Sequence, residues 1–333
     1  MVRYPAVIFA ILNVLFLAIC YHFIFWQQSS GIEIKLRAVE RAQQAQAIIG
    51  ARLIGEEYTP ITTTLGAKDA KQMSLHPDFA AVAVALLQEA GVQAGDKVAV
   101  NMSGSFPALN IAVLAAIESI GSTPIITSSV GASSWGANRP EFTWLDMENA
   151  LAAAGAGLWR SCAVSMGGGS DQGAGLPPEG IALIHSAIER SGITPLPSDT
   201  LQAAIEGRLQ LYQAQNQGVL PKVLVNIGGS HVFFGEQGHN MLLRQGLTRG
   251  YHPHIAAADG LAAAFLMNNR GVIHFINIKR LAAYYHIKPG ETGQSKVFHS
   301  LRIPLWLRVM IIFWLAGGGM WLWYGRRQKY WKC

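Results

Sequence analysis

Two similar strings of nine residues constrain the fold of this chain more than any other feature. Residues 97–105 read KVAVNMSGS, and residues 222–230 read KVLVNIGGS. Each is a short apolar run that ends in small polar residues, which predicts a buried strand followed by a turn. Open α/β sheets bind their ligands outside the carboxyl ends of parallel strands. We therefore expect two parallel strands whose carboxyl ends open onto one crevice.

The first of these turns leads into an apolar segment, residues 107–120, with Pro107 at its first position. Proline is favoured at the start of a helix because its missing N–H needs no partner there. The first turn of a helix leaves backbone N–H groups unpaired, and the helix dipole favours negative charge. With the hydroxyls of Ser103 and Ser105 nearby, this turn is predicted to suit a carboxylate or a phosphate.

Strand-like and helix-like patterns alternate along the central part of the chain. Strands are predicted at residues 97–101, 124–127, 159–166, 222–227 and 271–278, and helices at residues 77–90, 107–120, 144–154, 179–191 and 198–215. Such alternation predicts an α/β fold with a doubly wound, mainly parallel sheet.

Two apolar segments of 22 residues each, 5–26 and 303–324, flank this central region. At about 1.5 Å per residue, a helix of that length spans a hydrocarbon core of roughly 30 Å. We therefore expect two transmembrane helices in the lipid bilayer. Asn13 is polar within the first segment and is expected to pair with the second, because interhelical hydrogen bonds satisfy polar groups in lipid.

The distribution of charge orients these helices. All 20 acidic residues lie between Glu33 and Glu291, and the net charge of +6 resides at the two ends of the chain. The positive-inside rule then predicts that both termini are cytoplasmic and that the main domain is extracytoplasmic, in the cell (inner or cytoplasmic) membrane. This charge pattern does not resemble a phosphate-binding surface, so we expect no nucleic-acid partner.

The expected domain organisation follows from these segments. Residues 32–54 predict an amphipathic helix, because their apolar side chains recur at helical spacing, at Ile34, Leu36, Val39, Ala42, Ala45 and Ile49. A threonine-rich linker follows at residues 59–64. The predicted parts are a cytoplasmic tail at 1–4, a transmembrane helix at 5–26, an amphipathic stalk helix at 27–58, an extracytoplasmic α/β domain at 59–302, a transmembrane helix at 303–324 and a basic cytoplasmic tail at 325–333.

Four predicted strands are followed by loops rich in Gly, Ser and Asn, at residues 102–106, 128–139, 167–175 and 228–240. Small residues after parallel strands let the backbone approach a ligand closely. Turns are commonly made of such residues, but these loops are longer than a connection needs. The residues predicted to bind a ligand are Asn101, Ser103, Gly104, Ser134, Asn138, Gly168, Asn226, Gly229 and Ser230.

Catalysis in the same crevice is an open alternative. Ser105 lies on a predicted strand-to-helix turn, where a nucleophile can be exposed, although the GxSxG pattern is absent. His231 could act as its base and Asp171 could orient the histidine. The competing interpretation is that Ser105 caps the helix and His231 is an ordinary loop residue.

We expect no cofactor and no metal. The chain contains neither GxxxxGK[ST] nor a GxGxxG that opens a helix after a strand, so a nucleotide is not indicated. His231, His239, His252 and His254 are close in sequence, but no HExxH pair occurs and Pro253 predicts an extended segment.

Three longer strings carry a resemblance to a known family. These are VNMSGSFPALNIAVLAAIESIG, SSVGASSWGANRPEFTWLDME and VNIGGSHVFFG, within a chain that has two predicted anchors. In these strings the chain resembles the bacterial poly-gamma-glutamate system protein family, over nearly its whole length. Such proteins are encoded with the ligase and membrane subunits that make and export poly-gamma-glutamate. The resemblance implies no established mechanism and no catalytic residue.

The resemblance implies a membrane-anchored accessory component of poly-gamma-glutamate biosynthesis or export, whose outward-facing domain binds the polyanionic polymer or the synthase and export subunits. Whether the chain is an enzyme stays open. The alternative is an extracytoplasmic hydrolase or glutamyl transferase that acts on the polymer through Ser105 and His231.

Overall fold

The computed structural model describes residues 4–197, 199–236, 243–250, 259–299, 307–314 and 316 of the 333-residue chain. The chain divides into two compact units. One comprises Met1–Glu33 and His299–Cys333, and the other comprises Ile34–Phe298. The second unit contains the predicted α/β fold.

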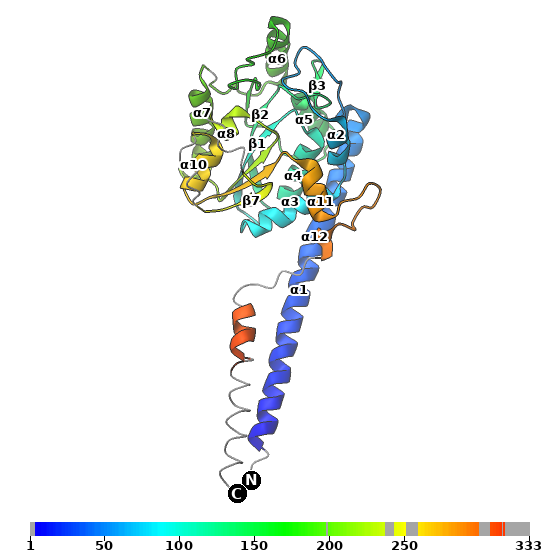
Figure 1. Cartoon of the computed structure of the whole chain (residues 1–333), viewed down its shortest axis with the longest axis vertical. Coiled ribbons are helices and arrows are strands. Elements are labelled where there is room, and N and C mark those ends of the chain that lie inside the picture. Colours follow the sequence, from blue (N-terminus) through cyan, green and yellow to red (C-terminus); the bar gives the residue numbers. More distant parts are fainter. Residues whose placement is uncertain are drawn as a thin grey trace. The chain divides into compact units, whose positions relative to one another are not determined.

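In the described part of the chain, six strands form the central sheet of the second unit (Figure 1). Their order is β5 (Ala163–Ser165), β2 (Thr123–Ser129), β1 (Lys97–Ser103), β6 (Val223–Ile227), β8 (Gly271–Phe275) and β7 (Gly246–Thr248). Neighbouring strands are parallel except β7, which is antiparallel to β8. The predicted α/β class and the mainly parallel sheet are thus confirmed.

The two similar strings form neighbouring strands at the centre of the sheet. From β1 the chain moves outward to β2 and β5, then crosses back to β6 on the other side of β1. The direction of winding therefore reverses between β1 and β6, where doubly wound sheets bind their ligands. Asn101 lies opposite Asn226 in this parallel pair, and Ala99 lies opposite Leu224.

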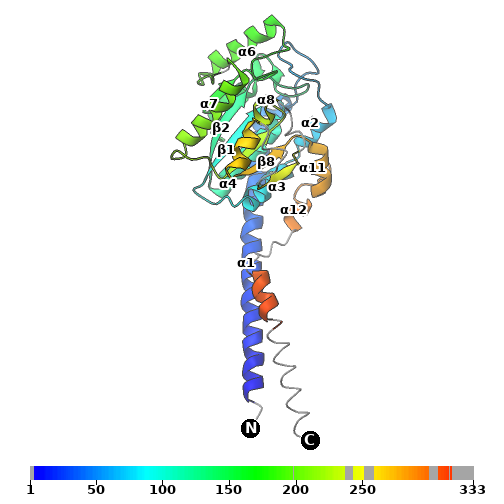
Figure 2. The same ribbon diagram turned by 60° about the vertical axis from the view of Figure 1, so that its left-hand side comes forward.

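Helices cover both faces of the sheet, as Figures 1 and 2 show. Side chains of β1 alternate between two hydrophobic clusters, with Val98 and Val100 in the larger cluster and Ala99 in the smaller. The larger cluster includes α3 (Asp78–Glu89), α4 (Pro107–Ile120), α5 (Trp144–Ala153), α6 (Pro178–Ser191) and α11 (Ile278–Tyr285). The smaller includes α7 (Leu201–Ala214), α8 (His231–Phe234) and α10 (Leu261–Met267).

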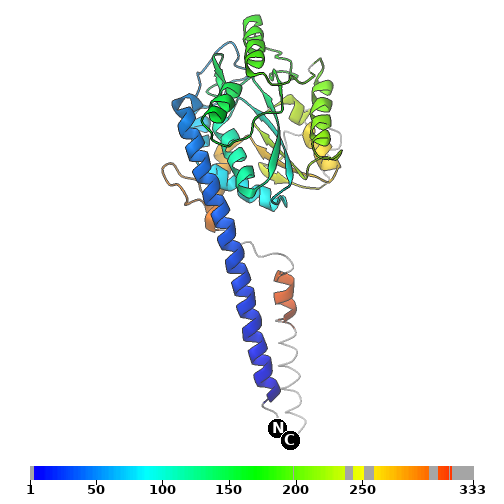
Figure 3. The same cartoon turned by 180° about the vertical axis from the view of Figure 1, so that it is seen from behind.

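Shorter elements and one long helix complete the described structure. They are α1 (Tyr4–Ile49), the 3₁₀ turn η1 (Gly50–Leu53), α2 (Lys68–Ser74), α12 (Lys296–His299) and a two-stranded ribbon of β3 (Asn138–Arg139) and β4 (Phe142–Thr143). In α1, the predicted apolar stripe is largely confirmed, because Val39, Ala42, Ala45 and Ile49 are buried in the larger cluster. Figure 3 views the second unit from the side on which α1 packs. Leu36 was expected in the stripe but is exposed.

Local sequence signals explain where the best-predicted helix begins and ends. Pro107 occupies its first turn, and Gly121 ends it in the left-handed conformation at φ 82°. Phe106, not Ser105, is its N-cap residue.

Other elements differ from the prediction. The predicted strand 271–278 was too long, since β8 ends at Phe275 and α11 begins at Ile278. The sequence did not predict α2, α8, α10, α11 or β7.

The first unit contains part of the two predicted membrane spans. Asn13 Oδ1 accepts a hydrogen bond from Trp314 Nε1 at 2.6 Å, and Phe16 stacks on Trp314 with 4.5 Å between ring centroids. The expected pairing of Asn13 with the second apolar segment is thus observed. Most of residues 303–324 lie outside the described residues. Among the helices that are described, none is long and apolar enough to cross a membrane, so the two spans stay a prediction.

A buried carboxyl on α5 gives the fold a titratable group. Glu148 accepts hydrogen bonds from the Ser161 N–H at 3.1 Å and from the Ser161 hydroxyl at 2.7 Å. Burial raises the pKa of Glu148 to about 7, although the hydrogen bonds from Ser161 act in the opposite direction. Glu148 therefore keeps its proton in the folded state at acidic pH values where an exposed glutamate has lost it.

We expect Glu148 to make the free energy of unfolding depend on pH. The folded-state pKa of Glu148 lies above its ordinary value of 4.5. Its contribution to the free energy of unfolding is therefore complete below pH 4.5 and is lost as the pH rises through about 7. Urea denaturation at a series of pH values measures this effect. As the pH rises across this range, the free energy of unfolding of the wild type should fall by roughly 3 kcal/mol relative to that of Glu148→Gln, which does not titrate. A difference between the two proteins that stays constant with pH would contradict this assignment.

Candidate functional site

A cavity of about 750 Å³ opens at the carboxyl edge of the parallel strands. Its walls come from the loops after β1, β2, β5 and β6, together with the segment that leads into α2. It is lined by Thr63, Thr64, Leu65, Gly66, Ala67, Ala70, Lys71, Ser103, Ser105, Phe106, Ser129, Gly131, Ser133, Gly167, Gly168, Gly169, Ala174, Gly229, Ser230, His231, Phe234, Gly235, Glu236 and Ile276. The four loops expected to share a crevice thus line one cavity.

Glycine allows the loop after β2 to approach its neighbours closely. A Cβ on Gly136 would lie 2.7 Å from the carbonyl oxygen of Gly104, and a Cβ on Gly131 would lie 2.5 Å from Thr63 Cγ2. Neither position has room for a side chain. The segment at 59–64 is therefore part of the cavity wall and not a free linker, since Thr63 N also donates to Ala132 O at 2.9 Å.

An amide pair forms the base of the site. Asn101 Nδ2 donates to Asn226 Oδ1 at 2.6 Å and to Ser230 Oγ at 3.3 Å. Asn101 Oδ1 accepts from Arg208 Nε at 3.2 Å. Buried polar groups are costly unless they are hydrogen-bonded, so this pair fixes how β1 and β6 lie beneath the cavity.

His274 on β8 extends this base. Its Nδ1 lies 3.1 Å from Asn226 Nδ2, and its ring stacks on Phe233 with 4.6 Å between centroids. Burial lowers the pKa of His274 to about 4, so the ring is neutral at physiological pH. Because the asparagine nitrogen can only donate, Nδ1 must accept its hydrogen bond.

A buried ion pair lies beside the amide pair. Arg208 Nη1 is 2.8 Å from Asp171 Oδ2, and the two side chains are 1% and 2% exposed. Ser165 bridges them, because its hydroxyl donates to Asp171 Oδ1 at 2.8 Å and accepts from Arg208 Nη2 at 2.7 Å. Asp171 therefore neutralises Arg208 and is not directed at His231.

Three serine hydroxyls in the cavity accept hydrogen bonds from the protein. Ser103 Oγ accepts from Ser105 N at 3.3 Å, Ser105 Oγ from Ser133 N at 3.1 Å, and Ser230 Oγ from Asn101 Nδ2 at 3.3 Å. Within the described residues, none of these three hydroxyls donates to a protein acceptor. Their hydrogens are therefore available to a ligand that accepts hydrogen bonds.

His231 adds a further donor. Its Nδ1 accepts from the backbone N–H of Ser170 at 3.0 Å. In a neutral imidazole, an acceptor at Nδ1 requires the proton at Nε2. His231 therefore offers an N–H to the cavity and, in this tautomer, has no free nitrogen with which to act as a base.

Lys71 of α2 is the one Lys or Arg among the described residues that line the cavity. Its side chain is 2% exposed, and Nζ lies 3.6 Å from the centroid of the Phe106 ring. Nζ donates to the carbonyl oxygen of Ser105 and lies 2.7 Å from Ser133 Oγ. Burial lowers the pKa of Lys71 to about 7.

The structure brings together some of the residues predicted from the sequence. Of the predicted catalytic residues, Ser105 and His231 line the cavity and Asp171 does not. Of the predicted ligand-binding residues, the lining includes Ser103, Gly168, Gly229 and Ser230, whereas Asn101, Gly104, Ser134, Asn138 and Asn226 are outside it. No hydrogen bond among the described contacts joins Ser105, His231 and Asp171 into a triad.

Asn138 has a structural position instead. Its Oδ1 accepts from Glu56 N at 2.9 Å, and its Nδ2 donates to Glu56 O at 2.8 Å and to Thr62 Oγ1 at 3.0 Å. These bonds hold the 56–62 segment against the loop after β2. Asn138 thus supports the segments that form the cavity wall without lining the cavity itself.

Sequence reasoning missed Lys71 and Ser133. Lys71 belongs to the string KDAKQMS, whose charges are typical of a solvated helix, so nothing local signals its burial. Ser133 directly precedes Ser134, which was predicted to bind a ligand. Only the backbone path decides which of two adjacent serines faces the cavity.

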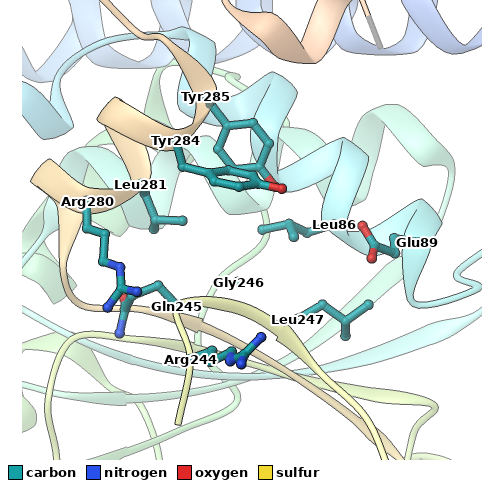
Figure 4. Close-up of a pocket in the computed structure, with 10 residues that line it drawn as sticks. All are labelled: Leu86, Glu89, Arg244, Gln245, Gly246, Leu247, Arg280, Leu281, Tyr284 and Tyr285. Carbon is teal, nitrogen blue, oxygen red and sulfur yellow. The ribbon is translucent and has the colours of Figure 1, made fainter. Parts of the chain in front are cut away.

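A second hollow of about 370 Å³ lies between α3, β7 and α11 (Figure 4). Its lining includes Arg244 and Arg280, the rings of Tyr284 and Tyr285, and Leu86. None of the residues predicted to form the site lines this hollow.

Metal binding finds no support in the described residues, where no group of three or more His, Cys, Asp or Glu side chains could hold an ion. Of the four histidines considered from the sequence, His239, His252 and His254 lie outside the described residues.

Comparison with protein-family models, with curated proteins and with solved structures finds no match for this chain. The function must therefore be inferred from the chemistry of the cavity and from the resemblance carried by its sequence.

We expect Asp171→Asn to destabilise the protein strongly. Removing one partner of a buried ion pair leaves the charge of Arg208 uncompensated, which typically costs about 3–5 kcal/mol. The free energy of unfolding from chemical denaturation measures this effect, and the exposed pair Lys222–Asp96 supplies the control, since Asp96→Asn should cost about 1 kcal/mol or less. If Asp171→Asn is as stable as the wild type, the ion pair is not structural.

Proposed function

We propose that this protein is a membrane-anchored accessory component of poly-gamma-glutamate biosynthesis or export, and that its α/β domain binds carboxylate-bearing chains in the cavity between β1 and β6. The observation that carries this proposal is the set of hydrogen-bond donors in the cavity. The hydroxyls of Ser103, Ser105 and Ser230 and the N–H of His231 belong to residues that line the cavity, and within the described residues none of them donates to a protein acceptor.

A site that offers hydrogen-bond donors favours a ligand that accepts hydrogen bonds. Ionised carboxylates accept several hydrogen bonds and donate none, and hydrogen bonds to charged groups are stronger than those between neutral groups. A cavity of about 750 Å³ lies within the usual range for ligand pockets. Poly-gamma-glutamate presents a carboxylate on every unit, so its chemistry matches the cavity. The resemblance in the strings around residues 100–121 and 225–235 supports the same context.

Two elements of the proposal rest on the sequence alone. Membrane anchoring and an extracytoplasmic domain follow from the apolar segments 5–26 and 303–324 and from the basic C-terminal tail. Association with synthase and export subunits follows from the resemblance. The alternative of a polymer hydrolase that uses Ser105 and His231 gains no support from the site, because His231 Nδ1 is already occupied by Ser170 N–H.

The binding proposal predicts that Ser230→Ala weakens the affinity for a short poly-gamma-glutamate oligomer. The variant removes one hydroxyl donor while Asn101 keeps its bond to Asn226. A hydrogen bond to a charged group contributes about 1.5–3 kcal/mol, so the dissociation constant should rise roughly 10- to 100-fold. Isothermal titration calorimetry of the full-length purified protein measures this change.

The matched control is Ser186→Ala, on the exposed side of α6, whose hydroxyl donates to the Ala182 carbonyl. This variant should bind the oligomer as the wild type does. An oligomer in which each carboxylate is replaced by a carboxamide should not bind. The proposal is wrong if the wild type fails to bind the oligomer, or if Ser230→Ala binds it unchanged.

The predicted topology has its own experiment. A phosphatase reporter, which is active only outside the cytoplasm, should be inactive when fused after Cys333 and active when inserted at the exposed turn at Gly218. A fluorescent protein that folds only in the cytoplasm should give the reverse result. An active phosphatase after Cys333 would overturn the proposed orientation.

A further inference from the structure

Lys71 and Ser133 form a contact of their own in the cavity, next to Ser105. Nζ of Lys71 lies 2.7 Å from Ser133 Oγ, and both residues line the cavity. Nζ is held in place by the Ser105 carbonyl and by the Phe106 ring. Ser133 N–H donates to Ser105 Oγ, which fixes the backbone of Ser133 at the same point.

No carboxylate balances the charge of this lysine in the described contacts. The charged groups on α2 face elsewhere, because Asp69 pairs with Lys279 of α11 and Lys68 lies over the Trp135 ring. His231 and Glu236 belong to the lining on the α8 side of the cavity. Burial alone lowers the pKa of Lys71 to about 7, so a large fraction of the amine is uncharged near neutral pH.

We propose that Lys71 and Ser133 form a serine–lysine dyad that cleaves an amide bond of the bound carboxylate-bearing chain by acyl transfer. This inference rests on the proposed function for its substrate class, since the amide bonds of such a chain lie between its carboxylates. It assigns the nucleophile to Ser133, the base to Lys71 and no catalytic base to His231.

The chemistry follows from the two groups. Ser133 Oγ attacks the amide carbonyl carbon and its proton passes to the neutral amine of Lys71, which becomes an ammonium. The C–N bond then breaks, the ammonium returns the proton to the leaving amine, and an ester to Ser133 remains. Water attacks the ester carbonyl, Lys71 accepts a proton from it and delivers it to Ser133 Oγ as the C–O bond breaks. The balance is one water consumed for one amide converted to a carboxylic acid and an amine.

Ser105 has a role next to the nucleophile. Its hydroxyl oxygen is 3.1 Å from the backbone nitrogen of Ser133, and its hydrogen is not committed within the described contacts. Preorganised donors stabilise the negative charge that develops on a carbonyl oxygen during acyl transfer. Ser105 is therefore placed to donate to that oxygen.

Labelling with a fluorophosphonate tests the dyad without depending on the polymer. Attack by Ser133 Oγ forms an O–P bond and expels fluoride, while Lys71 takes the proton. Mass spectrometry of the full-length protein should locate the adduct on Ser133. The labelling rate should rise up to tenfold per pH unit below about 7 and level off above it, as the amine loses its proton.

Two variants and one control accompany this measurement. Ser133→Ala and Lys71→Met should each lower the labelling rate at least about 100-fold, in line with the contribution of a nucleophile and its base. Thermal unfolding of both variants is measured in parallel to check that they fold. If Lys71→Met does not fold, Ser133→Ala still tests the dyad, because it removes only one atom from the cavity surface. Ser186→Ala should label like the wild type.

The outcomes separate this inference from the binding proposal. Adduct on Ser133 with the stated pH profile, together with shortening of a poly-gamma-glutamate oligomer, supports the dyad. Oligomer binding with no adduct overturns the dyad and leaves the binding proposal standing. An adduct on Ser105, or a rate independent of pH, also overturns it. Adduct on Ser133 without binding or shortening of the oligomer overturns the substrate class.

Discussion

The pairing of β1 with β6 is the constraint on which the rest of this structure depends. Asn101 and Asn226 lie opposite each other in this pair, and the hydrogen bond between their amides at 2.6 Å is buried. A shift of either strand by one residue would move its asparagine to the opposite face of the sheet and break this hydrogen bond. The amide pair therefore specifies the register of β1 against β6. That register places the two serine-containing turns side by side at the point where the winding of the sheet reverses.

Much of this fold could be predicted because its signals are local. Pro107 and Gly121 mark both ends of α4, and the prediction of residues 107–120 matches the helix. The strands β1 and β6 are continuous apolar runs of the kind that a parallel sheet buries on both faces. The convergence of four loops at one edge also follows from the sequence, because parallel strands necessarily end on the same side of a sheet.

The site could be predicted only in part because its key contacts join residues that are distant in sequence. Asp171 is a carboxylate in a glycine-rich loop, which is typical of a catalytic residue. It instead forms an ion pair with Arg208, which lies on a helix further along the chain. Lys71 lies in a short polar helix whose string gives no reason for burial. It becomes buried because the loops containing Ser105 and Ser133 fold over it. Periodicity predicts which face of an element is apolar, but not which polar side chain a distant loop will enclose.

Under the two proposals made for this cavity, its electrostatics allow carboxylate binding and amide cleavage to share one space. A fully charged lysine would be the strongest site for a carboxylate and would draw that group onto Ser133. Burial lowers the pKa of Lys71 to about 7 and so weakens this competition near neutral pH. In the proposed complex, the carboxylates are bound by the hydroxyl of Ser230 and the N–H of His231, on the side of the cavity formed after β6. The proposed dyad requires the uncharged amide between two carboxylates to lie beside Ser133, where a neutral amine can accept a proton. Under both proposals, the desolvation of Lys71 determines where the carboxylates of the bound polymer lie and where its amide bond meets Ser133.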